Sequence, residues 1–163
     1  MKRRSSPILV FTKVAGMVLL CILLCIAASW IYTKAVLNHA KVEGVYATAE
    51  EGMLALLEKS YVEPEVRIIG AGPNDPYGSN PHVWYVVACV WAEKRIDGSP
   101  VGNSRRDDYD QPGSFFLDTK DGWVYVGEGA FPGIVGTWMK AFGWAGPGSS
   151  QPSQEMGSGR CFH

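Results

Sequence analysis

The chain has 163 residues, of which 47% are hydrophobic and 19% charged, and its formal net charge is −1. Residues 1–13 hold four of the 15 basic residues and no acid, so residues 14–163 carry a net charge of −5. An acidic remainder argues against nucleic acid as a partner, because phosphate backbones are bound through basic surfaces.

Residues 14–33 form a run of twenty residues without a charge, VAGMVLLCILLCIAASWIYT. At about 1.5 Å per residue, such a helix matches the roughly 30 Å hydrocarbon core of a bilayer. We therefore predict one transmembrane helix over 14–33, in contact with the lipid bilayer. The run contains no Asp, Glu, Lys, Arg or His, the groups that proton and ion paths need. The predicted helix is therefore interpreted as a tether.

The flanks of this run predict its orientation. The basic segment 1–13 is expected to stay in the cytoplasm, because positive flanks translocate poorly. Trp30 and Tyr32 lie near the other end, where aromatic rings suit the headgroup layer. We thus predict a single-pass protein of the cell membrane with its N-terminus in the cytoplasm and the bulk of the chain outside. The alternative is a signal peptide cleaved before Trp30, but its typical apolar region of about 7–15 residues is shorter than this run.

After the predicted span, residues 34–47 keep a helical character and are predicted to form a stalk. Gly44 is expected to act as a hinge, because glycine weakens a helix by about 1 kcal/mol relative to alanine. A helix is predicted over 48–60, where Thr48 and Glu51 form a capping-box pattern. Its apolar stripe consists of Met53, Leu54, Leu56 and Leu57.

Strands are predicted after this helix. A short strand covers 65–69, and a turn-rich loop covers 70–81. Residues 82–92 (HVWYVVACVWA) are almost all apolar, which is typical of a central strand covered on both faces. Residues 114–127 are predicted to form a β-hairpin, with a type I′ turn at Asp121-Gly122.

The predicted hairpin has two different faces. One face carries Leu117, Thr119, Val124 and Val126 and is expected to pack under the 48–60 helix. The other face mixes polar and aromatic residues. We predict that Trp123 and Tyr125 are exposed there, and that Phe116 is either partly covered or part of the same surface. Aromatic surfaces of this kind bind proteins or apolar ligands, so the candidate binding residues are Phe116, Trp123 and Tyr125.

A closing helix is predicted over 132–143, with Pro132 at its first position and Gly143 at its end. This helix is the candidate cover for the aromatic face of the hairpin. Residues 144–163 are rich in Gly, Pro, Ser and Gln and are predicted to be a disordered tail.

The element order in residues 48–143 predicts one extracytoplasmic α+β domain. Its sheet is expected to be antiparallel, because no helix separates the strands. A helix laid across a curved antiparallel sheet resembles the cystatin-like and ketosteroid-isomerase-like architectures. The resemblance covers the exterior domain alone and implies no active-site residue.

The sequence predicts no catalytic residue, no metal site and no cofactor. His39, His82 and His163 are too far apart in sequence for a local metal-ligand spacing. Cys89 is expected to pack in the core and Cys161 to lie in the tail. A disulfide between them is therefore not expected.

These observations predict a membrane-anchored exterior domain that binds an envelope protein or a small apolar ligand. Two alternatives stay open. The first is a small enzyme like ketosteroid isomerase, with Asp118 or Glu93 as a base in a cavity between helix and sheet. The second is a structural spacer or assembly factor whose tail does the binding.

Overall fold

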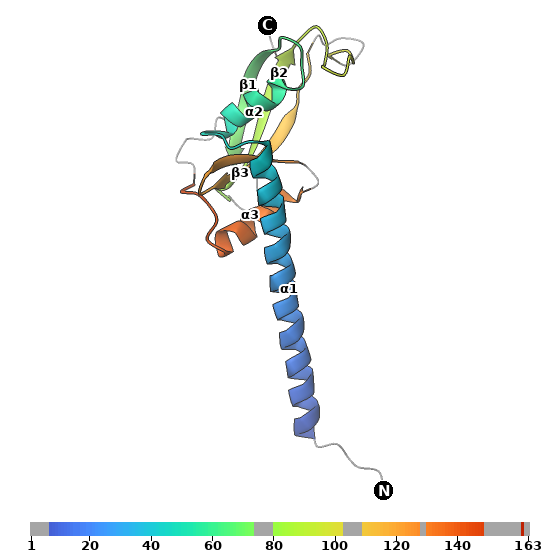
Figure 1. Ribbon diagram of the computed structural model, residues 1–163, viewed down its shortest axis with the longest axis vertical. Helices are drawn as coiled ribbons and strands as arrows, with labels where there is room; N and C mark the ends of the chain where they lie inside the picture. The colour runs from blue at the N-terminus through green and yellow to red at the C-terminus, as the bar shows by residue number, and fades with distance from the viewer. Residues whose placement is uncertain (1–6, 74–79, 103–108, 128–129, 149–160, 162–163) are drawn as a thin grey trace.

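The computed structural model of the protein describes residues 7–73, 80–102, 109–127, 130–148 and 161. Figure 1 shows one long helix that extends well beyond a small domain of strands and shorter helices. The fold is α+β, as predicted, and the sheet is antiparallel.

Helix α1 runs without a break over Pro7–Glu43, so it contains both the predicted span and most of the predicted stalk. Within Lys13–Glu43 the mean hydropathy reaches 2.6, and the helix is long and apolar enough to cross a bilayer. It ends at the predicted hinge. Gly44 follows with a φ of +156°, a conformation that residues with a side chain rarely adopt.

Helix α2 (Ala49–Glu58) begins at the predicted capping box. The Glu51 N–H donates to the Thr48 hydroxyl at 3.1 Å, and the Ala47 N–H donates to the Glu51 carboxylate at 3.0 Å. Two N–H groups at the helix start are satisfied in this way, which is why the helix begins here.

The four strands lie in the sheet in chain order, so the central position predicted for the apolar strand is confirmed. Strand β1 is longer than predicted, because it continues through residues 70–73 after a register shift between Ile68 and Gly70. Pairing with β2 holds these residues extended, although their composition is typical of a turn. The strands are β1 (Glu65–Pro73), β2 (Val83–Trp91), β3 (Gly113–Thr119) and β4 (Gly122–Val126).

The β3–β4 hairpin has a different turn from the predicted one. Thr119 pairs with Gly122, so the central turn residues are Lys120 and Asp121, and neither has a positive φ. The predicted type I′ turn, which needs positive φ at both central residues, is therefore wrong. Because the register differs by two residues and not by one, each side chain keeps its predicted face.

Both faces of the sheet are covered, but by the opposite helices to those predicted. Helix α2 lies on the face of Phe116, where a Cβ on Gly52 would come within 2.5 Å of the Phe116 ring. The end of α1 and helix α3 (Pro132–Ala141) cover the face that was assigned to α2. The prediction failed because the stalk was treated as separate from the domain. The core cluster on this face of the sheet consists of Leu37, Ala40, Val83, Leu117, Val124, Val126, Val135 and Met139.

The first part of the predicted disordered tail is packed against β3. The Gly146 N–H donates to the Asp118 carbonyl at 3.0 Å, and the Gly148 N–H donates to the Asp118 carboxylate at 2.7 Å. The prediction of disorder is therefore wrong for residues 144–148. Hydrogen bonds from backbone N–H groups to Asp118 hold this segment, and the amino-acid composition does not predict them. The remaining tail residues, apart from Cys161, lie outside the described residues.

Cys161 forms a disulfide with Cys89 of β2, and their Cα atoms are 5.8 Å apart, within the usual span of such a bond. The expectation that these cysteines stay apart is therefore wrong. The burial of Cys89 in the sheet does not prevent pairing, because the partner cysteine comes from the same chain.

Candidate functional site at the base of the domain

The fold separates the three aromatic residues that were predicted to form a binding surface. Phe116 is fully buried and Trp123 is 8% exposed, and both belong to the core beneath α2. The rings of Trp123 and Trp84 meet edge to face, with centroids 5.3 Å apart. The prediction that Trp123 is exposed is therefore wrong, because α2 covers this face. Tyr125 is half-buried and borders a groove.

This groove, which we call the upper groove, lies between α1 and the end of β4. Its volume is about 510 Å³, within the range typical of ligand sites. Its lining is mostly apolar. Two polar side chains of α1 also contribute, and their atoms His39 Nδ1 and Glu43 Oε1 are 3.6 Å apart. The upper groove is lined by Tyr32, Ala35, Val36, His39, Ala40, Glu43, Tyr125, Val126, Gly127 and Ala130.

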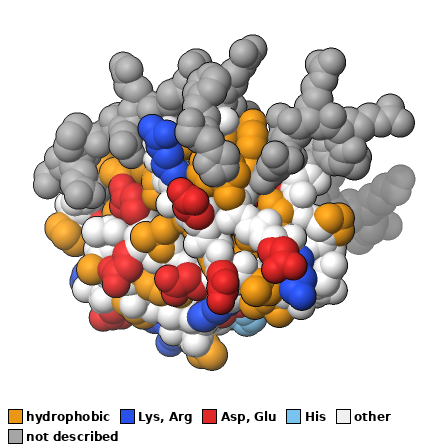
Figure 2. All heavy atoms as spheres, turned by 90° about the horizontal axis from the view of Figure 1, so that it is seen from above, with side chains coloured by type: hydrophobic (Ala, Val, Ile, Leu, Met, Phe, Trp, Pro, Cys, Tyr) orange, Lys and Arg blue, Asp and Glu red, His pale blue; other side chains and the backbone are white. Residues whose placement is uncertain are grey.

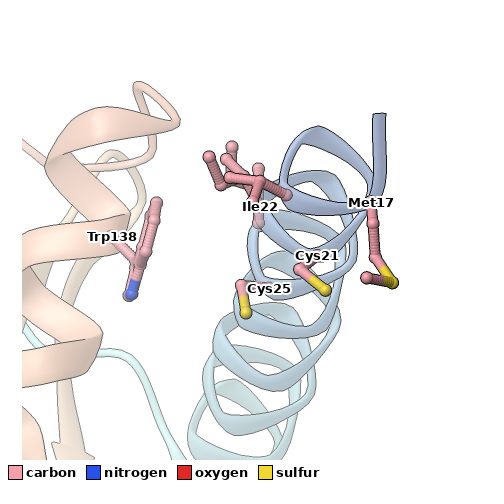
Figure 3. Close-up of a pocket in the computed structure, with 7 residues that line it drawn as sticks. Met17, Cys21, Ile22, Cys25 and Trp138 are labelled. Atoms are coloured by element: carbon pink, nitrogen blue, oxygen red, sulfur yellow. The ribbon is translucent and has the colours of Figure 1, made fainter. Parts of the chain in front are cut away.

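A second groove, the lower groove, lies between the predicted membrane span and α3. Figure 3 shows Trp138 of α3 beside α1, across open space from Ile22 and Cys25. The volume of this groove is about 530 Å³, and none of the described residues that line it is charged. The lower groove is lined by Met17, Val18, Cys21, Ile22, Cys25, Ile26 and Trp138.

A row of four rings joins α1 to α3 through the segment that follows α3. We call this row of Trp30, Trp144, Phe142 and Trp138 the aromatic chain. Its successive ring centroids are 5.9, 5.1 and 5.3 Å apart, distances at which aromatic rings attract one another. The aromatic chain therefore fixes the C-terminal end of α3 beside the middle of α1.

Lysines gather in a third groove next to the aromatic chain, the lysine groove, whose volume is about 450 Å³. The Lys34 ammonium lies 4.7 Å from the centroid of the Trp30 ring, a favourable cation–π geometry. Lys41 forms an ion pair with Asp121. The hydrogen bond and charge of Lys41 lower the pKa of the Asp121 carboxyl from its usual value. Lys120 also lines this groove, so the groove is electropositive.

The two carboxylates considered as catalytic bases lie in unsuitable places. Asp118 is 4% exposed, and its Oδ2 atom accepts the Gly148 N–H and lies 3.5 Å from His82 Nδ1. Glu93 is exposed to solvent beyond the end of β2. A base must reach its substrate in a partly dehydrated site. The chain covers Asp118 and solvent surrounds Glu93, so neither arrangement suits that role.

Sequence reasoning missed the aromatic chain and the lower groove, although α3 carried a signal. Ile134, Trp138 and Phe142 follow one another at intervals of four residues along one side of the helix. Val135 and Met139 lie on its buried side. A helix that is apolar on two sides requires two apolar partners, and the sheet supplies only one of them.

No family model matches the chain, and neither a curated protein nor a solved structure matches it. No functional residue is therefore carried over from another protein.

Proposed function

We propose that this protein is a single-pass membrane protein whose exterior domain binds a protein partner in the upper groove. The continuity of α1 carries the proposal. One helix holds a membrane-length apolar segment and, at Leu37 and Ala40, part of the domain core. The anchor and the domain therefore form one piece, and the groove beside Tyr125 lies where they join.

Two observations support an exterior location for the domain, and a third supports its contact with water. The basic segment 1–13 favours a cytoplasmic N-terminus. The chain forms a Cys89–Cys161 disulfide, and disulfides persist mainly in oxidising compartments outside the cytoplasm. Figure 2, a view onto the end of the molecule far from the start of α1, shows acidic side chains spread over the surface among basic and hydrophobic ones. Such a mixed, charged surface suits a face turned toward water.

The chemistry of the upper groove favours a protein partner. An apolar side chain of the partner would fill the apolar part, and the exposed His39 and Glu43 would contribute to a polar rim. A small apolar ligand is the second kind of molecule that would fit this groove.

We also propose that the domain resembles the cystatin-like and ketosteroid-isomerase-like folds. The position of α2 across the antiparallel strands supports this likeness.

Photo-crosslinking from within the upper groove tests this proposal. A benzoyl-phenylalanine at position 35, which is exposed and lines the groove, is compared with one at position 42. Val42 lies on the same helix outside the groove and is 88% exposed. We expect a discrete protein adduct from position 35 alone after irradiation of the native membrane. An adduct of small mass would indicate the apolar ligand instead, and identical patterns from both positions would contradict the proposal.

A further inference from the structure

We infer that α3 is a second membrane contact, and that lipid acyl chains cover its exposed side and fill the lower groove. The inference rests on the proposed function, because it requires α1 to span the bilayer. Figure 1 shows α3 at the end of the domain that is nearest the N-terminal half of α1. The depth of α3 along the span determines whether water or lipid surrounds it.

The lower groove gives the depth of α3. The part of α1 that lines it, from Met17 to Ile26, lies inside the predicted span. Ile26 precedes Lys34, the first charged residue after the span, by eight residues, which is about 12 Å along a helix. Trp138 shares the groove with these residues and so lies below the level of Lys34. At that depth the groove must hold acyl chains, because the hydrocarbon core contains no water.

The surface of α3 agrees with a lipid environment. Phe131 at its start is 64% exposed, and Ile134 is 53% exposed. Trp138 lies one turn after Ile134 on the same face, whereas the opposite face is buried in the core. The helix contains no acidic residue, and its one basic residue is Lys140 in the last turn. An exposed apolar face that carries no acidic residue suits contact with lipid.

The residues around α3 also match the layers of a bilayer. Trp30 and Trp144 form the upper end of the aromatic chain, and tryptophan is enriched at the headgroup level. Lys34 and Lys120 line the lysine groove beside these two rings, where their ammonium groups would meet lipid phosphates. Apolar residues, aromatic rings and cations therefore follow one another in the order expected from the hydrocarbon core outward.

Spin-label accessibility in the full chain tests the inference. The protein carries Cys21→Ala and Cys25→Ala, keeps its disulfide, and is reconstituted in phosphatidylcholine vesicles. A nitroxide is attached at Ile134→Cys, with Phe131→Cys as a second position on α3. Ile96→Cys, at a residue that is 60% exposed and follows β2, is the matched control in water, and Leu23→Cys on α1 is the control in lipid. Collisions with oxygen, which enters lipid, are compared with collisions with a water-soluble nickel chelate.

We expect the ratio of oxygen to nickel collisions at position 134 to approach that at position 23 and to exceed that at position 96. An aqueous ratio at 134 with a lipid ratio at 23 would overturn the inference while leaving the anchor intact. Protection of 134 from both reagents would also overturn it, because a protein would then cover α3. An aqueous ratio at 23 would instead contradict the proposed function itself. Unchanged thermal unfolding of each labelled variant shows that it is folded.

Discussion

Single residues on one strand face differ in what they contribute to stability, and Trp123 and Tyr125 illustrate this. Trp123 is almost fully buried and meets Trp84 edge to face, whereas Tyr125 is half-buried. We expect Trp123→Ser to lower the free energy of unfolding by about 3–5 kcal/mol, because it opens a large cavity in the core. The matched change Tyr125→Ser should cost less. Denaturant unfolding in detergent measures both, and equal losses would contradict the burial of Trp123.

Asp110 is the centre of a polar cluster at the other end of the sheet. Its carboxylate accepts hydrogen bonds from Arg95 Nη2 at 2.7 Å, from the Tyr61 hydroxyl at 3.0 Å and from the Gly102 N–H at 3.0 Å. Burial alone would raise the pKa of Asp110, but these hydrogen bonds hold it below its ordinary value of 3.8. Burial and the neighbouring Asp110 raise the pKa of the Tyr61 hydroxyl. The cluster therefore favours a charged Asp110 and a neutral Tyr61.

The lowered pKa of Asp110 predicts a dependence of stability on pH. A group whose pKa is lower in the folded state stabilises the fold above its unfolded pKa, and the effect is lost as pH falls through the folded pKa. We expect Asp110→Asn to destabilise the protein near neutral pH, and the stabilities of the two proteins to converge as the pH falls through the lowered pKa of Asp110. Denaturant unfolding measured from neutral to acid pH checks this. Glu58→Gln, an exposed change on α2, is the control. If the difference in unfolding free energy between the native protein and Asp110→Asn stayed constant with pH, the lowered pKa of Asp110 would be refuted.

At the scale of elements, the sequence predicts those features that local chemistry determines. The start of α2 follows from the hydrogen bonds of Thr48 and Glu51, and the end of α1 follows from Gly44. The second half of β1 was missed, because residues 70–73 are extended only through pairing with β2. The faces of the hairpin were predictable despite the wrong turn, because side chains alternate with a period of two.

The positions of helices on the sheet required information that local patterns do not contain. Helices α2 and α3 are both amphipathic, and either would suit either face by composition. The arrangement is decided by the stalk, whose residues Leu37 and Ala40 occupy the face shared with α3. The candidate site was missed for the same reason. Trp30 is more than 100 residues from Trp138 and Trp144 in sequence, and it meets Trp144 only because α1 continues into the domain.

At the scale of the whole molecule, α1 leaves little free chain between the predicted membrane span and the domain. Lys34 follows the uncharged run, and Leu37, three residues later, is already in the core. Three helical residues cover only about 4.5 Å. A domain joined in this way cannot move far from the predicted span, in contrast to one on a flexible linker. The upper groove and α3 are therefore held in a nearly fixed position relative to the span.

This coupling makes Leu37 a residue of the domain, although it lies on the anchor helix. We expect Leu37→Ala to lower the free energy of unfolding of the domain by about 2–4 kcal/mol, through lost apolar burial and a cavity against β4 and α3. Val42→Ala on the same helix, where the side chain is 88% exposed, should change it by no more than about 0.5 kcal/mol. Denaturant unfolding of the detergent-solubilised protein, followed by tryptophan fluorescence, compares the two variants. Similar small effects would mean that α1 is a separate element, and that the position of the domain relative to the predicted span is not fixed by the fold.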